Sequence, residues 1–379
     1  MVKWIAWVVA PIALIGAVAT GYYFTDMGEA AKPPAQTAPS PTSPAPATPP
    51  ASQPEPVPAE EWRTAELHVR EGTALVSLDQ LAPDLITQLS VDEAEGIATF
   101  LCRGAKIELL KGSPTVGIDG IFDAVTRSPE FSDGKVYIPV ELVQKLFGAD
   151  RVKQEGNLLS VRIDKTEALP TLAVAHQLDL DQASPQELAD YLRFLDLPIK
   201  NGKVTKKSSQ LPNAPRTYRN GVHEGLDWYD GFAGSGIVVG TPVYAMADGK
   251  VVRSDLGYKE FTVEERDVVL GIAAKAPSTP LWILDKLRGR TVWVQHDKGV
   301  LVRYAHLDGI PAEITPGTVV KKGQLIGYVG NSGTSYGVEK SKLGAHLHSD
   351  ILVYGELFWK NLKSQDEIRN VLVEIYEKP

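Results

Sequence analysis

The sequence of 379 residues contains a single cysteine and no excess of basic residues. With only Cys102 available, an intrachain disulfide is excluded, so each folded part must be stabilised by its own core. The net charge of −8 argues against nucleic acid as a partner, because phosphate binding needs clustered Lys and Arg. Cys102 ends the apolar run 98–102, which favours a small buried hydrophobe over a reactive thiol.

Charged residues are also missing from residues 4–25, an apolar run of 22 residues that is long enough to cross a bilayer. Lys3 precedes this run and Asp26 follows it, which predicts that the amino terminus lies on the cytoplasmic side of the membrane and the rest of the chain on the outer side. We therefore expect residues 1–25 to form a single transmembrane anchor. A cleaved signal peptide is the alternative, because residues 17–19 (Ala-Val-Ala) resemble a cleavage site. Both interpretations export the rest of the chain.

Proline is concentrated in residues 33–58, where 11 of 26 residues are proline. Such a segment cannot bury a core, and at about 3.1 Å per residue it spans up to about 80 Å when extended. We expect residues 26–61 to be a disordered linker that holds the folded part away from the membrane.

Residues 62–165 show short apolar runs separated by Gly and Asp turns, which predicts a first folded domain. The predicted strands are 74–78, 97–101, 106–110, 136–139 and 158–163, and a helix over 140–147 should end at Gly148. Residues 135–148 resemble the small domain named after the amino terminus of copper amine oxidases. The resemblance implies a small α+β domain. It says nothing about copper, and His68 and Cys102, the only soft ligands in the region, are too few for a copper site.

Residues 166–205 are interpreted as a connector. Ser184 and Glu187 form a capping box with Pro185 at the first helical position, which predicts a helix over 185–195.

The pattern over 206–360 changes to short strands and predicts an antiparallel all-β domain. The predicted strands are 236–239, 243–247, 250–254, 291–296, 300–306, 324–330 and 346–353. Asp248-Gly249 predicts a tight hairpin between two of them. Residues 257–290 interrupt the pattern as a helical insertion, with one helix capped by Thr262 and another starting at Thr279. Residues 361–379 are expected to form a terminal helix or tail.

Two histidines lie at i and i+2 in the predicted strand 346–353. Side chains at this spacing share a face, so His346 and His348 should project together, about 7 Å apart at roughly 3.3 Å per residue. Leu347 should face the core. Asp350 shares the face of His348, where it either orients that imidazole or remains a solvated rim carboxylate.

A further histidine and an aspartate lie in the segment His223-Glu224-Gly225-Leu226-Asp227. The segment can be mistaken for the helical zinc signature, in which a Glu between two histidines acts as the base. The second histidine is missing, and the surrounding Gly and Pro residues disfavour a helix. We interpret it as a loop offering one nitrogen and one oxygen ligand. Two histidines and one carboxylate, with an open fourth position, are an arrangement found in catalytic zinc sites.

These two segments, together with Tyr304-Ala305-His306-Leu307 and the run 317–333, resemble the lysostaphin/LytM-type zinc metalloendopeptidases. The resemblance covers roughly residues 211–355. It implies that His223, Asp227 and His348 bind one Zn²⁺ per chain and that His306 and His346 are catalytic. The family usually has an aromatic residue and Glu after the last histidine, whereas this chain has Ser349 and Asp350.

The resemblance implies hydrolysis of peptide bonds in peptidoglycan by metal-activated water. His346 would take the proton from that water, and His306 would stabilise the developing oxyanion. The other three histidines, His68, His176 and His296, are interpreted as structural. Two alternatives to an active enzyme remain: an inactive family member that regulates other wall hydrolases, and a wall-binding scaffold in which residues 62–165 are the functional part.

Overall fold

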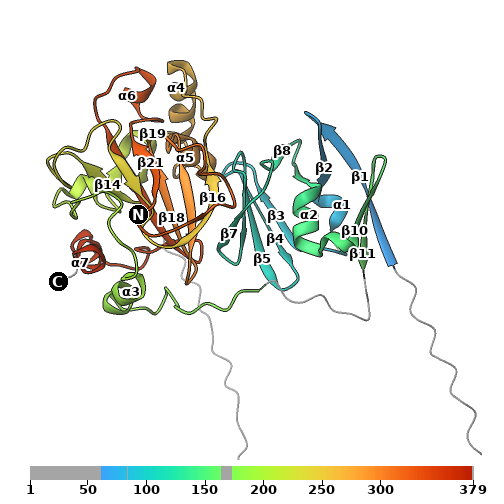
Figure 1. The fold of residues 1–379 in the computed structure, drawn as a ribbon. Coiled ribbons are helices and arrows are strands. Elements are labelled where there is room, and N and C mark those ends of the chain that lie inside the picture. Colours follow the sequence, from blue (N-terminus) through green and yellow to red (C-terminus); the bar gives the residue numbers. More distant parts are fainter. Residues whose placement is uncertain (1–60, 83, 164–172, 378–379) are drawn as a thin grey trace, which may run out of the picture. The chain divides into compact units, whose positions relative to one another are not determined.

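The computed structural model describes residues 61–82, 84–163 and 173–377, and its sheets are built from antiparallel strand pairs (Figure 1). In these ranges no helix is both long enough and apolar enough to span a membrane. The expected anchor at 1–25 and nearly all of the expected linker at 26–61 lie outside the described residues.

Residues 61–163 form two antiparallel sheets and two short α-helices around one apolar core. One sheet has the order β10-β11-β1-β2-β9-β8, and the other runs from β3 to β7 in sequence order. The elements are β1 (Glu61–Arg70), β2 (Thr73–Ser77), α1 (Leu78–Leu81), β3 (Thr87–Asp92), β4 (Ile97–Cys102), β5 (Ala105–Leu110), β6 (Thr115–Ile118), β7 (Ile121–Ala124), β8 (Glu130–Ser132), β9 (Lys135–Pro139), α2 (Val140–Phe147), a 3-10 turn (Ala149–Arg151), β10 (Val152–Glu155) and β11 (Leu158–Ile163). The helix α2 has the predicted bounds and ends at Gly148, whose φ of +94° suits glycine.

The C-terminal region is built on a seven-stranded antiparallel sheet of order β14-β22-β18-β17-β16-β20, with β23 paired to β22, and a three-stranded sheet of order β15-β21-β19. Its strands are β12 (Pro215–Arg216), β13 (Gly221–Val222), β14 (Leu226–Tyr229), β15 (Pro242–Tyr244), β16 (Gly249–Ser254), β17 (Val292–His296), β18 (Val300–Ala305), β19 (Leu307–Gly309), β20 (Val319–Val320), β21 (Leu325–Val329), β22 (His346–Val353) and β23 (Glu356–Leu357). Apolar residues of both sheets form one core cluster. The antiparallel β architecture predicted for this region is therefore confirmed.

Two helices from distant parts of the sequence cover this core. These are α3 (Pro185–Leu192) and α7 (Gln365–Tyr376), which lie side by side (Figure 1). The predicted capping box at Ser184 and Glu187 is present, although α3 ends at Leu192 rather than at residue 195. Two 3-10 turns, Ser208–Gln210 and Thr217–Arg219, and the short helix α6 (Ser335–Val338) complete the region.

The predicted hairpin at Asp248-Gly249 is wrong. The strand before the turn, β15, pairs with β21 in the three-stranded sheet, whereas the strand after it, β16, pairs with β17 and β20. The chain therefore changes sheets at this turn, and Val243 and Val251 on either side of it are both fully buried in the shared core.

The predicted strand at 236–239 is also absent. The side chain of Asp230 accepts hydrogen bonds from the backbone N–H groups of Gly236 (2.6 Å) and Ile237 (3.2 Å), which holds the segment in a turn. A side-chain acceptor thus takes the donors that a strand would have used.

The expected insertion lies between β16 and β17 and contains α4 (Val263–Ala273) and α5 (Leu281–Leu287). Thr262 and Glu265 form the predicted capping box of α4. Pro280 is the N-cap residue of α5, and Gly289 follows its end at φ +67°.

Candidate active site

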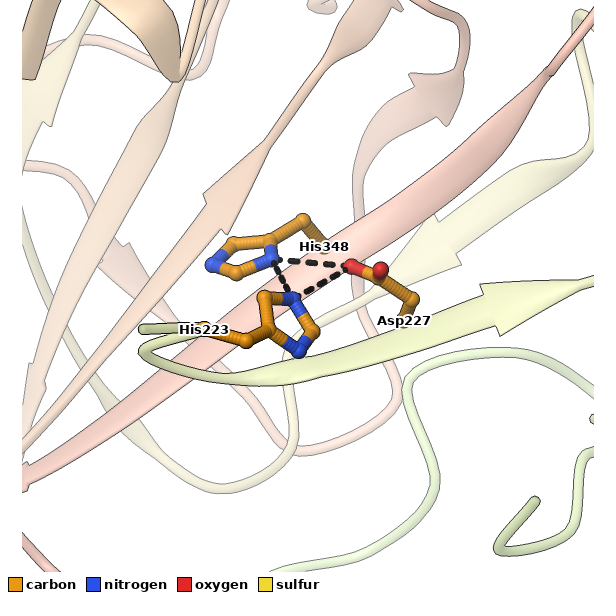
Figure 2. Close-up of side chains that lie close together, drawn as sticks. All are labelled: His223, Asp227 and His348. Carbon is orange, nitrogen blue, oxygen red and sulfur yellow. Dashed lines mark hydrogen bonds and ion pairs between the residues drawn. The ribbon is translucent and has the colours of Figure 1, made fainter. Parts of the chain in front are cut away.

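Three strongly polar side chains from two neighbouring strands and one loop meet at the edge of the large sheet (Figure 2). Asp227 lies on β14 directly opposite His348 on β22, and His223 lies in the loop that leads into β14. Residues opposite each other in an antiparallel pair point to the same face. The strand register therefore brings Asp227 and His348 together, and the predicted loop supplies His223.

The three ligand atoms are nearly equidistant. His223 Nε2 lies 2.9 Å from Asp227 Oδ1 and 3.0 Å from His348 Nδ1, and His348 Nδ1 lies 2.9 Å from the same carboxylate oxygen (Figure 2). All three residues are buried. The structure thus places together the three residues that the sequence predicts as metal ligands.

In His223 and His348, the ring nitrogen that points away from the cluster makes a hydrogen bond that determines the tautomer of the imidazole. His223 Nδ1 lies 2.9 Å from the carbonyl oxygen of Leu211, and His348 Nε2 lies 2.6 Å from Asp350 Oδ1. Because these oxygens accept hydrogen bonds, the two nitrogens must be the donors, which leaves His223 Nε2 and His348 Nδ1 as acceptors. Two nitrogen lone pairs and a carboxylate oxygen then face one another.

Such a set of acceptors requires a shared positive charge. Burial opposes ionisation of Asp227, but the neighbouring His223, His346 and His348 hold its pKa well below the usual range. Burial would lower the pKa of His348, but Asp350 and Asp227 raise it to about 9. The cluster therefore attracts a proton, and a divalent cation would satisfy the same atoms. Two imidazoles and one carboxylate suit zinc in particular.

His306 and His346 lie beside this cluster but turn different atoms toward it. Their Nδ1 atoms donate to backbone carbonyls, at 2.7 Å to Ser332 and 2.8 Å to Gly344 respectively. In the neutral ring of each histidine, Nε2 therefore carries the free lone pair. The two ring centroids are 4.8 Å apart, and His346 Nε2 lies 3.7 Å from Asp227 Oδ1.

Both of these histidines are held in the neutral form. Burial, together with the neighbouring His346 and His348, keeps the pKa of His306 well below its usual value. Burial also lowers the pKa of His346, although Asp227 opposes this effect. A neutral imidazole with a free Nε2 can accept a proton, and after protonation the same nitrogen can donate one.

Asp350 orients His348 rather than lying on a solvated rim. It is fully buried, accepts from His348 through Oδ1, and lies 2.9 Å through Oδ2 from both Arg288 Nε and Arg303 Nη2. Of the two interpretations of Asp350 from sequence, the orienting one is therefore confirmed. Leu347 is fully buried in the core, as the alternation predicts.

All five predicted site residues line one groove of about 1000 Å³. The insertion forms part of its wall through Arg266, Leu270, Leu284, Leu287 and Arg288. Glu224 also lines the groove, but its two oxygens accept from Arg219 Nη2 at 3.0 and 2.9 Å. This ion pair leaves Glu224 poorly suited to act as a base.

The other histidines lie elsewhere. His68 makes an edge contact with Tyr137, His176 stacks on Tyr354, and His296 is buried with Nδ1 2.9 Å from the carbonyl oxygen of Asp248. These positions agree with the structural interpretation of all three.

Three residues that contact the site were not identified from the sequence. Tyr229 stacks on His346 with ring centroids 4.1 Å apart, and Arg216 Nη2 lies 3.3 Å from Asp227 Oδ2. Tyr229 is two residues beyond Asp227, so strand alternation could have revealed it. Arg216 and Arg288 carry no such local signal.

The comparisons with known proteins agree with the chemistry of the groove. The model of Peptidase family M23 matches residues 272–358, a range that includes His306, His346 and His348. The predicted resemblance to the LytM-type peptidases is therefore confirmed for this part of the chain. His223 and Asp227 precede the matched range, and the structure brings them to it. A search of curated proteins found no match.

Several solved structures resemble the chain at low identity. LytU is 23% identical, with 41% of this chain and 78% of LytU covered and a TM-score of 0.26. The catalytic domain of the antimicrobial peptidase lysostaphin from Staphylococcus simulans is 20% identical, with 49% of this chain and 92% of that domain covered and a TM-score of 0.24. A zinc-containing peptidase from Vibrio cholerae is 16% identical, with 79% and 68% covered and a TM-score of 0.26.

Proposed function

Residues 272–358 of this chain match the model of Peptidase family M23. We propose that the chain is a zinc-dependent endopeptidase that hydrolyses peptide bonds in peptidoglycan stem peptides or cross-bridges. The observation that carries the proposal is the convergence of His223, Asp227 and His348, whose three ligand atoms lie 2.9 to 3.0 Å apart. A groove of about 1000 Å³ gives a peptide access to these atoms.

Zinc bound by His223, Asp227 and His348 would supply Lewis-acid chemistry, polarising the scissile carbonyl and acidifying water. The chain's own residues do the remaining work. His346, neutral with a free Nε2 near the cluster, accepts the proton of the attacking water and returns it to the leaving amine. His306, whose ring centroid lies 4.8 Å from that of His346 and 5.7 Å from that of His348, is placed to stabilise the developing oxyanion. Tyr229 holds the plane of His346 by stacking.

The sequence supports an extracytoplasmic location for the enzyme. We place the peptidase outside the cytoplasm, anchored by residues 1–25 and separated from the membrane by the proline-rich residues 26–61, because the charge-free run and its flanks favour export. Secretion after signal cleavage is the alternative. Residues 62–165 would then target the enzyme within the wall.

Metal content and cell-wall cleavage, measured on the purified full chain, test this proposal. We expect one equivalent of zinc and chelator-sensitive release of peptides from purified peptidoglycan, identified by mass analysis. Asp227→Ala should lose both zinc and cleavage, whereas His346→Ala should retain zinc and lose turnover by at least about 100-fold, the usual minimum contribution of a general base. His176→Ala, outside the groove, is the control and should behave as the wild type.

Two outcomes would contradict the proposal. Cleavage by His346→Ala at the wild-type rate would refute its role as base. Stoichiometric zinc without release of wall peptides would instead indicate the non-catalytic regulator or scaffold.

A further inference from the structure

The end of the helical insertion not only lines the groove but also forms hydrogen bonds to residues that contact the site histidines. We propose that residues 257–290 position the zinc ligand His348 and the catalytic His306, with Arg288 and Glu260 as the two positioning residues. This inference rests on the proposed function of the site.

Arg288 reaches the zinc ligand through one carboxylate. Its Nε lies 2.9 Å from Asp350 Oδ2, and Asp350 Oδ1 lies 2.6 Å from His348 Nε2. The side chains of Arg288 and Asp350 are 6% and 0% exposed, so water does not compete for these bonds. A buried carboxylate held by charge on one side fixes the ring plane and the basicity of the imidazole on its other side. The lone pair of His348 Nδ1 is thereby aimed at His223 and Asp227.

The same residue reaches a catalytic histidine through its backbone. The carbonyl oxygen of Arg288 accepts from the N–H of His306 at 2.9 Å. His306 has φ +59°, a left-handed conformation that costs a non-glycine residue energy and persists only where its surroundings enforce it. The hydrogen bond from Leu307 N to the carbonyl oxygen of Arg290, at 3.0 Å, holds the next residue in the same way.

The loop that orients the His306 ring is packed backbone to backbone against the insertion. A Cβ atom added to Gly289 would lie 2.4 Å from the Ser332 backbone, and one added to Gly333 would lie 2.5 Å from the Leu287 carbonyl oxygen. Both glycines also have positive φ, at +67° and +74°. The loop therefore cannot move independently of the end of α5, and its Ser332 carbonyl is the acceptor for His306 Nδ1.

Glu260 holds this loop from the other end of the insertion. Its two carboxylate oxygens lie 3.1 and 3.0 Å from the backbone N of Gly333, and Tyr258 donates to it at 2.7 Å. Glu260 contacts neither His348 nor Asp350 through any hydrogen bond in the described residues. Its effect should therefore reach His306 and leave the metal ligands unchanged.

These two routes predict different outcomes in the full chain. Arg288→Gln should raise the zinc Kd by about 10-fold, the lower end of the effect of losing a partner behind a metal ligand, because Arg303 Nη2 still holds Asp350 Oδ2 at 2.9 Å, and should also lower kcat. Arg288→Lys, which keeps the charge, should recover part of the zinc affinity. Glu260→Ala should lower kcat about 10-fold, with KM and zinc Kd unchanged.

The readouts are zinc Kd by competition with a chromophoric chelator, kcat and KM on wall peptides, and the urea midpoint of unfolding. Arg369→Gln is the control for Arg288, because Arg369 is in the same region and its Nε donates to the Thr205 carbonyl, away from the groove. Glu264→Ala on α4 is the control for Glu260. Both controls should keep zinc Kd and kcat within twofold of wild type.

The inference fails if Arg288→Gln binds zinc within twofold of wild type, or if the controls change zinc Kd or kcat as much as the test variants. If Arg288→Gln does not fold, the comparison of Glu260→Ala with Glu264→Ala decides, and equal kcat values overturn the inference. Absence of zinc or cleavage in the wild type would instead refute the proposed function.

Discussion

Glu224 lies between two proposed zinc ligands, yet its chemistry should be structural. Its carboxylate accepts two hydrogen bonds from Arg219, whose side chain is 4% exposed while that of Glu224 is 11% exposed. Arg219 also donates to Thr279 Oγ1 at 2.9 Å and to the Val222 carbonyl oxygen at 2.6 Å. Removing the carboxylate would leave a buried guanidinium charge without its counter-ion.

The magnitude follows from this geometry. Removing one partner of a buried ion pair costs about 3–5 kcal/mol, because the remaining charge is desolvated and uncompensated. We therefore expect Glu224→Ala to lower the free energy of unfolding by about 3–5 kcal/mol. Glu224→Gln retains an acceptor oxygen but loses the charge, and should cost about 1–3 kcal/mol. Replacing both partners with apolar residues, as in Arg219→Met with Glu224→Leu, should recover much of the loss.

Urea unfolding of the zinc-loaded full chain measures these free energies, and cleavage of wall peptides measures kcat on the same samples. At temperatures where Glu224→Gln is folded, its kcat should lie within about threefold of wild type. The opposite pattern would refute the reasoning: a loss of 100-fold or more in kcat with unchanged stability is the signature of a general base.

Two further predictions concern a buried histidine and a close backbone contact. Burial lowers the pKa of His296 from about 6.5 to about 4, so the native state binds this proton less readily than the unfolded state. The stability that the neutral ring contributes is complete above pH 7. It should fall by about 2–3 kcal/mol by pH 4.5, because the unfolded state takes up the proton first as the pH falls. Urea unfolding from pH 7 to 4.5 should show this fall in wild type relative to His296→Gln, and parallel curves would contradict it. A Cβ atom at Gly225 would lie 2.2 Å from the Ser349 carbonyl oxygen, so Gly225→Ala should displace the His223 loop from β22 and raise the zinc Kd at least about 10-fold. Gly271→Ala, at an α4 position with open space around it and no positive φ, is the control and should leave the zinc Kd unchanged.

The sequence identifies the centre of the site well because its chemistry is local. His346 and His348 share a face through the two-residue period of a strand, and the same period places Leu347 in the core. Asp350 follows by the same rule, although only the structure decides between an orienting and a solvated role. The helix at 140–147 has its predicted bounds, and the helix at 263–273 begins directly after its predicted cap Thr262, for an equally local reason.

Contacts between distant segments are harder to predict. Arg288 is 62 residues from Asp350, and no spacing rule links an arginine after a helix to a carboxylate in a central strand. The turn at Asp248-Gly249 is correctly located, but its local chemistry does not determine which strand β15 will pair with. Sheet membership depends on which buried faces fit together, and this information is spread over the whole domain.

The position of Asp227 opposite His348 makes the metal site sensitive to how β14, an edge strand, joins the sheet. A slip of one residue would turn Asp227 away from the histidines and bring Trp228, now fully buried, to the groove side. A slip of two residues would restore the face but move the carboxylate two residues along β22, opposite His346 or Asp350 instead of His348. The fraction of refolded chains that bind one zinc ion would then equal the fraction in which β14 is paired with β22 in the correct register. Metal content can therefore report the accuracy of folding independently of catalysis.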